Sequence, residues 1–178
     1  MKFKAAQKKA VANFDNPEFI ENIKDEDPNM VNHLGILKQI NECGFLTTNS
    51  QAGIKPIKTL FHERAYILGF MVKNDAAQFI KNMSIETDKV VICPSFEICV
   101  DKSFDIPLSI EKTDELKVIT HMSISVPRRI WDQERKLLDL DKKDIVYIFC
   151  WDPKWNRNAS NKNGLFRDVL KILKNINI

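Results

Sequence analysis

Two apolar runs constrain the fold most, because runs of this length and composition are typical of buried strands. "DIVYIFCW" at residues 144–151 is almost continuously apolar, and "RAYILGFM" at residues 64–71 is mostly so. A strand that is apolar on both faces is covered on both faces and lies inside a sheet. Both runs are far shorter than the roughly 20 apolar residues of a membrane-spanning helix. The sequence therefore predicts a sheet with the 144–151 strand near its centre.

The segments around these runs alternate between helical and extended patterns. Apolar spacing and capping residues predict helices over residues 1–14, 28–43, 74–83 and 127–138, and from residue 163 onward. Further strands are predicted at residues 45–48, 89–94, 95–100 and 116–126, with residues 101–114 as a loop or an edge strand. The Asn16-Pro17 pair and the acidic residues after it predict that residues 15–27 form a loop with one helical turn at most. This order predicts an α+β fold, in which helices pack on a single mixed sheet.

The chain length and charge limit the kinds of protein considered. A chain of 178 residues predicts one domain, residues 1–178, in which residues 1–27 are either integral or a peripheral extension. The N-terminus has no apolar stretch of the signal-peptide type, so the four cysteines are expected to be reduced and the chain not to be secreted. A net charge of +3 is too small to demand a polyanionic partner.

Common cofactor signatures are missing from the sequence. It contains no glycine-rich phosphate loop, no dinucleotide-binding fingerprint and no nucleophile elbow, and it has only five glycines. The cysteines and histidines lack the close spacing of metal ligands. No cofactor and no metal are therefore expected.

A polar stretch follows the predicted strand at residues 45–48. Thr47, Thr48, Asn49, Ser50 and Gln51 are side chains that favour turns by bonding to nearby backbone groups. The alternative is a ligand site in which Thr47, Ser50, Gln51 and Arg64 converge at one end of the sheet. In that arrangement Arg64 would hold an anion, and Ser50 or Gln51 would orient the ligand.

A second group combines aromatic and basic residues near the C-terminus. It comprises Trp151, Lys154, Trp155 and Arg157, together with Arg128 and Trp131. Such side chains stack on bases and neutralise phosphates, and they are also enriched in protein interfaces. Three interpretations stay open: tryptophans that close the end of the core, a protein interface, and a nucleic-acid surface.

The segments "INECGFLTTNSQAG" at residues 40–53 and "ERAYILGFM" at residues 63–71 resemble a segment pair in uncharacterised proteins. The similar proteins are those of large DNA viruses, especially marseillevirus-like ones, and an actinobacterial domain of unknown function. The matching positions are Asn41, Gly44, Phe45, Thr47, Ser50, Gln51, Gly53, Arg64, Ala65, Gly69 and Phe70, whereas Ala52 and Glu63 depart from the pattern. The resemblance covers only residues 40–71 and implies kinship without an activity.

Two functions are expected from these observations. The first is a viral binding protein in the cytoplasm or nucleus of the infected cell, or in the virion, with a protein or nucleic acid as partner and no membrane contact. The second is a small-molecule-binding protein or enzyme with a polar pocket near Gln51 and Arg64. The sequence favours the first slightly, because no activated nucleophile, acid–base pair or metal set is visible. The oligomeric state does not follow from the sequence.

Overall fold

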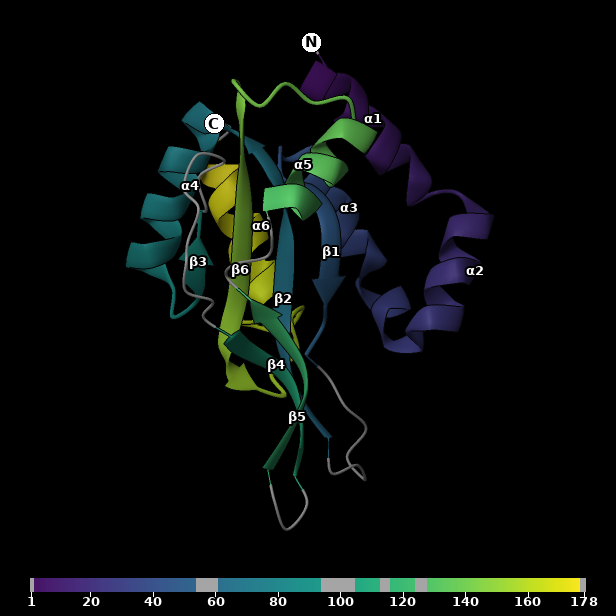
Figure 1. The fold of residues 1–178 in the computed structure, drawn as a ribbon, viewed down its shortest axis with the longest axis vertical. Coiled ribbons are helices and arrows are strands. Elements are labelled where there is room, and N and C mark those ends of the chain that lie inside the picture. The colour runs from purple at the N-terminus through teal and green to yellow at the C-terminus, as the bar shows by residue number, and fades with distance from the viewer. Residues whose placement is uncertain (1, 54–60, 94–104, 113–115, 124–127, 177–178) are drawn as a thin grey trace.

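The protein is described by a computed structural model that covers residues 2–53, 61–93, 105–112, 116–123 and 128–176 (Figure 1). These residues form an α+β fold with a single six-stranded sheet. In chain order the elements are α1 (Lys2–Asn13), α2 (Pro17–Glu26), the 3-10 helix η1 (Pro28–His33), α3 (Leu34–Glu42), β1 (Leu46–Gln51), β2 (Phe61–Val72), α4 (Lys73–Glu86), β3 (Val90–Ile92), β4 (Asp105–Lys112), β5 (Leu116–Ser123), α5 (Arg128–Leu137), β6 (Ile145–Trp155) and α6 (Leu165–Ile176). The predicted α+β class with one sheet is confirmed.

The sheet has the strand order β3-β6-β2-β4-β5, and β1 also pairs with β2. Every strand pair in the described part of the chain is antiparallel, so the prediction of a mixed sheet is wrong in this respect. The reason is the position of β6. It is antiparallel to both β2 and β3, so it separates two strands that run in the same direction and are joined through α4. The 144–151 run does form a central strand, as its apolar character predicts.

Each face of the sheet carries its own apolar core. On one face, β2 and β6 contribute Ile67, Met71, Ile148 and Cys150, which pack with residues of α3, α4 and α6. On the other face lie Leu68, Phe70, Tyr147, Phe149 and Trp151, with Leu138 and three residues of α1 against them. Figure 1 shows α5 in front of the sheet and α6 behind it. The apolar side chains at successive positions of β2 and β6 are thus explained by burial on both faces.

The N-terminal 27 residues hold a second helix that the sequence did not predict. Residues 17–26 form α2, because Asn16 caps it by accepting a hydrogen bond from the Glu18 backbone N–H at 3.0 Å, and Pro17 occupies the first turn. Proline has no backbone N–H, but at the first helical position this N–H would have no partner within the helix, so proline is tolerated there. The Asn-Pro pair therefore begins a helix here, and the prediction of a loop is wrong. Asp27 then caps η1 by accepting from the Asn29 N–H at 3.1 Å.

The polar stretch after Gly44 is a strand and not a turn. Gly44 ends the preceding helix with a φ of 101°, the left-handed conformation predicted for it. Residues 46–51 then pair with β2, from Leu46 opposite Phe70 to Gln51 opposite Tyr66, with an irregularity between Thr47 and Asn49. Gly69 lies so close to β1 that a Cβ placed on it would be 2.1 Å from the Leu46 carbonyl oxygen. This close approach fixes β1 against β2.

The remaining differences concern the ends of strands. Residues 105–112, part of the segment predicted as a loop or an edge strand, form β4, and β6 extends beyond the predicted 144–151 strand to Trp155. The predicted strand at residues 95–100 lies outside the described residues. Among the described residues, Cys43, Cys93 and Cys150 are not in disulfide bonds, and Cys99 lies outside the described part. No described helix is long and apolar enough to cross a membrane.

Candidate functional site

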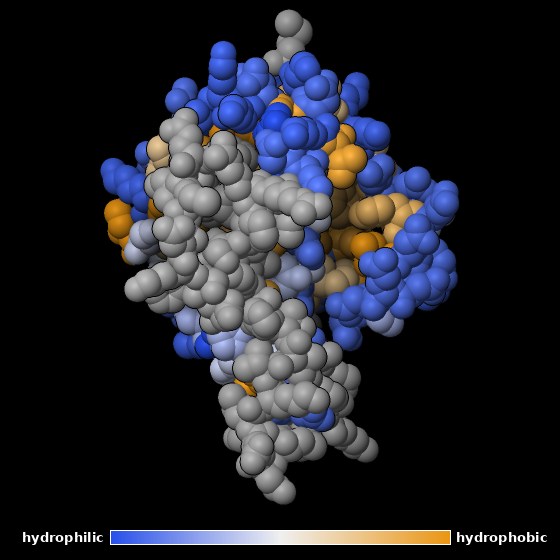
Figure 2. All heavy atoms as spheres, viewed as in Figure 1, coloured by the Kyte–Doolittle hydropathy of each residue, from blue (hydrophilic) through white to orange (hydrophobic). Residues whose placement is uncertain are grey.

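A groove of about 590 Å³ lies between β1 and the N-terminal helices, and α5 closes one end of it. Figure 2 shows a hollow with apolar side chains, framed by hydrophilic ones, on the side where α1 and α2 lie in Figure 1. A volume of this size is within the range of ligand-binding pockets, roughly 300–1,000 Å³. The groove is therefore the first candidate for a functional site.

Helix α2 and the segment before it build the outer wall of the groove. Phe14 and Phe19 pack edge to face with ring centroids 5.6 Å apart, across the turn that Asn16 and Pro17 make. The apolar part of the lining comprises Ala10, Phe14, Phe19, Ile23, Met30, Leu34, Leu37, Leu46, Leu137 and Leu138. Leu137 is 87% exposed at the edge of the groove, an unusual position for a large apolar side chain.

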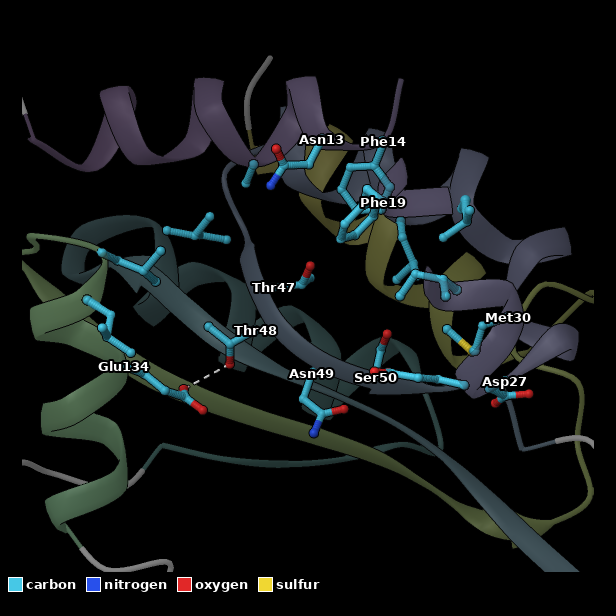
Figure 3. A pocket seen from close by; sticks show the side chains of 18 residues that line it. Asn13, Phe14, Phe19, Asp27, Met30, Thr47, Thr48, Asn49, Ser50 and Glu134 are labelled. Atoms are coloured by element: carbon cyan, nitrogen blue, oxygen red, sulfur yellow. Dashed lines mark hydrogen bonds between the residues drawn. The ribbon is translucent and has the colours of Figure 1, made fainter. Parts of the chain in front are cut away.

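Strand β1 supplies the polar floor (Figure 3). Asn41 fixes Thr47 by two hydrogen bonds: its Nδ2 donates to Thr47 Oγ1 at 2.7 Å, and its Oδ1 accepts from the Thr47 N–H at 3.0 Å. Thr48 Oγ1 donates to Glu134 Oε2 at 3.0 Å, which ties β1 to α5. Within the described part of the chain, the hydroxyl of Ser50 has no hydrogen-bond partner, so it can bind a ligand.

Among the described residues of the lining, the charged ones are all acidic. They are Glu26, Asp27 and Glu134, and no lysine, arginine or histidine is among the lining residues that the structure describes. Burial raises the pKa of Glu134, and the hydrogen bonds from Thr48 and Tyr147 offset this only in part. Burial and the nearby Glu134 likewise raise the pKa of Tyr147 well above its usual range. Glu134 is thus a half-buried carboxylate that has no cationic partner among the described residues of the groove.

The structure divides the four residues that the sequence grouped as a ligand site. Thr47 and Ser50 line the groove, whereas Gln51 and Arg64 do not. Gln51 Nε2 donates to the backbone oxygen of Arg64 at 3.2 Å, and Arg64 Nη1 donates to the Pro107 oxygen at 3.2 Å. The guanidinium of Arg64 also lies 4.1 Å from the ring centroid of Trp155, a cation–π arrangement. Arg64 therefore stabilises the junction of β2, β4 and β6 and does not line this groove.

The aromatic-basic group is largely engaged inside the protein. Trp151 is 9% exposed and stacks on Phe149 with ring centroids 5.0 Å apart, so it belongs to the core. Trp155 is half-buried beneath Arg64. Arg157 pairs with Asp88 at 2.8 Å and with Asp152 at 2.5 Å, while Lys154 is exposed. Arg128 and Trp131 belong to α5, and their side chains are outside the described set.

A buried ion network joins β3, β6 and α6, and we call it the Lys89 network. Lys89 Nζ, which is fully buried, donates to Asp88 and to the Asn163 oxygen at 2.8 Å, and it lies 3.1 Å from Asp168 and 3.5 Å from the buried Asp152. Burial alone would raise the pKa of Asp88, but the hydrogen bonds from Lys89 and Arg157 hold it well below its usual range. Each charge in the network faces an opposite charge, which indicates a structural role. Its members come from segments that are far apart in sequence, residues 88–89 and 152–168, so no local pattern predicted it.

A histidine–serine pair connects the two ends of the chain. His33 Nδ1 lies 2.5 Å from Ser160 Oγ, and the His33 ring packs edge to face on Phe166. Burial lowers the pKa of His33, so its neutral form is favoured. His33 Nε2 is buried without a hydrogen-bond partner among the described residues, and the pair lines neither the groove nor the Lys89 network. We interpret the pair as a tie between η1 and the segment before α6. In the described part of the chain, no three His, Cys, Asp or Glu side chains are grouped to hold a metal ion.

Comparison with protein families identifies a relationship. Residues 16–175 match the family described as a domain of unknown function (DUF6919). The matched region includes every element from α2 to β6 and most of α6, but it begins after α1. No curated protein matches the chain.

Proposed function

The chain belongs to the DUF6919 family, and because this family has no described function we propose one from the groove: a binding protein for a positively charged organic molecule with an apolar body. The observation that carries the proposal is the composition of the groove lining. The charged residues of the described lining are all carboxylates, although the whole chain has a net charge of +3. The acidity therefore belongs to the groove and not to the protein as a whole.

The lining suits the two parts of such a ligand. Phe14, Phe19, Met30 of η1 and the leucines of α3 and α5 offer apolar and aromatic surface for its body. A desolvated ammonium group gains by pairing with a carboxylate and by contact with an aromatic face. Glu134 provides the carboxylate, and Thr48 and Tyr147 hold it in place through their hydrogen bonds. An anionic ligand would instead be repelled by all three acidic side chains.

The proposal is tested with three probes of equal length and different charge: hexylamine, hexanol and hexanoate. Binding is measured by nuclear magnetic resonance titration, which also locates the perturbed residues. We expect hexylamine to shift the signals of β1 and α5, hexanol to bind more weakly, and hexanoate not to bind. Glu134→Gln keeps the hydrogen bond from Thr48 but removes the charge, and it should weaken hexylamine binding about 10–100-fold, the value of a charge-assisted hydrogen bond of about 1.5–3 kcal/mol.

The matched control is Glu86→Gln, the same change at an α4 residue that pairs with Lys171 and does not line the groove. This variant should bind hexylamine as the wild type does. Equal binding of hexylamine and hexanoate, or shifts confined to other surfaces, would contradict the proposal.

A second proposal concerns macromolecular partners at the end of β6. Lys154 has a side chain that is 68% exposed and lies 3.5 Å from Asp88, and it precedes Trp155, whose ring lies against the Arg64 guanidinium. This smaller surface could bind a protein or a nucleic acid, and the resemblance at residues 40–71 supports a viral, intracellular setting for it. Trp155→Ala should then reduce capture of the partner from lysate of infected cells, whereas unchanged capture would count against this surface.

A further inference from the structure

The carboxylates of the groove lie at its two opposite ends. Figure 3 shows Glu134, from α5, at one end and Asp27, at the start of η1, at the other. Glu26 is the last residue of α2, so it adds a second carboxylate at the Asp27 end. Thr48 and Ser50 lie along β1 between these ends.

Both ends keep oxygen atoms available for a ligand. Glu134 accepts hydrogen bonds from Thr48 and Tyr147, and because a carboxylate has about four acceptor sites, it can still accept from a ligand. Asp27 uses Oδ1 to cap η1, where it accepts from the Asn29 N–H, so its Oδ2 can accept from a ligand. An ammonium group has three donors and can use a carboxylate oxygen together with a hydroxyl such as that of Ser50.

The region between the two ends is apolar above a polar floor. Phe14 and Phe19 face β1 across the groove, as Figure 3 shows, and Met30 lies toward the Asp27 end. Thr48 and Ser50 are two positions apart on an extended strand, which places them about 7 Å from each other. A ligand that reaches both acidic ends therefore needs a chain of several methylene groups between its charges.

We infer that the groove binds an aliphatic diamine or polyamine, with one ammonium group at Glu134, the other at Asp27 and Glu26, and the methylene chain against Phe14 and Phe19. This inference rests on the proposed function, because it specifies which positively charged molecules the groove prefers. A lysine side chain of a partner protein offers one ammonium group and would use only one end. The diamine uses the charges at both ends at once.

The experiment compares diamines with monoamines by isothermal titration calorimetry on the full chain. The probes are α,ω-diamines of three to eight carbons, spermidine, and the monoamines of the same lengths. We expect the best diamine to bind at least about tenfold more tightly than its monoamine, since the second ammonium group adds a charge-assisted hydrogen bond. The affinity should pass through an optimum with chain length, because a short diamine reaches only one end.

Two substitutions test the ends separately. Asp27→Asn keeps a side chain that caps helices well and removes only the charge. Glu134→Gln keeps the hydrogen bond from Thr48. Each variant should bind the best diamine about tenfold more weakly and abolish its advantage over the monoamine. If the Asp27→Asn variant still binds the diamine more tightly than the monoamine, the double variant Glu26→Gln/Asp27→Asn should bind the two equally. A double variant that still prefers the diamine would overturn the inference.

The matched control is Asp25→Asn, which makes the same change on the exposed side of α2, away from the lining. It should leave the advantage of the diamine unchanged. Diamines and monoamines that bind the groove equally would overturn the inference and leave the proposed function intact. Absence of binding by both kinds of amine would overturn both.

Discussion

Replacing Lys89 with methionine removes a fully buried ammonium group and keeps an unbranched side chain of similar length. The wild-type ammonium lies among three carboxylates and the Asn163 oxygen. Its removal leaves Asp152, which is also fully buried, with one cation fewer. Breaking a buried ion pair from one side costs about 3–5 kcal/mol, because a charge is left uncompensated.

The lower end of this range applies here. Asp152 keeps Arg157 at 2.5 Å and accepts from the Lys154 backbone N–H at 2.9 Å, so its charge is still partly compensated. We therefore expect Lys89→Met to lower the free energy of unfolding by about 3 kcal/mol, the lower limit for breaking a buried ion pair. For a chain of this size the corresponding fall in Tm is about 6–12 °C.

Urea unfolding at neutral pH, followed by circular dichroism, measures the change, and a thermal scan measures Tm. The control is Lys171→Met, which removes an exposed lysine that lies 3.1 Å from Glu86, and a surface pair of this kind is worth about 0–1 kcal/mol. A Lys89→Met protein within about 1 kcal/mol of the wild type would refute the reasoning, because its loss would then be no larger than that of a surface pair. Amine binding in the groove should be the same in both variants, because the Lys89 network does not line it.

Three further outcomes follow from the site and the sheet. Burial raises the pKa of Glu134, so the folded state loses stability as the pH rises from the ordinary pKa of a glutamate to the raised pKa. Glu134→Gln removes this ionisation and should raise Tm at neutral pH. The difference in Tm between the variant and the wild type should vanish in acid, where Glu134 is protonated in both states. The pKa of Asp88 is shifted the opposite way, so Asp88→Asn should lower Tm at neutral pH, and the difference should shrink as pH falls below about 4, where the unfolded chain begins to bind the proton. Gly69→Ala places a methyl group 2.1 Å from the Leu46 oxygen, and it should cost about 1–3 kcal/mol in urea unfolding and speed hydrogen exchange in β1.

Much of the fold follows from short-range patterns that the sequence displays. The apolar runs of β2 and β6 predict buried strands, and Gly44 marks the end of a helix by the same left-handed conformation that the structure shows. These features depend on neighbouring residues alone. The pairing of strands depends on residues that are far apart in sequence. For this reason the sequence predicted neither the position of β6 between β2 and β3 nor the antiparallel order of the sheet.

Local signals fail where one residue pair permits two structures. Asn16-Pro17 occurs in turns and also at the start of helices, and Phe19 and Ile23 decide for the helix by lining the groove. The polar residues of β1 likewise favour a turn by composition, whereas pairing with β2 holds them extended. In both cases a tertiary contact overrides the local preference.

The candidate site combines residues from three distant parts of the chain. Thr47 and Ser50 were predicted as site residues, and both line the groove. Glu134 and Asp27 were not, because an acidic residue on a helix or at a cap is ordinary when seen alone. Thr48 and Glu134 meet across 86 positions of sequence, so only the folded chain shows that these acidic residues share a groove.

The central place of β6 has a consequence for how the protein is made. Its pairing joins Val72 to Ile145 and Arg64 to Trp155, contacts of long sequence separation of the kind that slow folding. During synthesis β2 and β3 leave the ribosome well before the strand that lies between them. The nascent chain therefore holds two apolar strands with unpaired edges, a state prone to aggregation. A truncated chain that ends before residue 145 lacks β6, which lies between β3 and β2 in the sheet. We therefore expect the truncated chain to stay bound to a chaperone and not to form a smaller native fold.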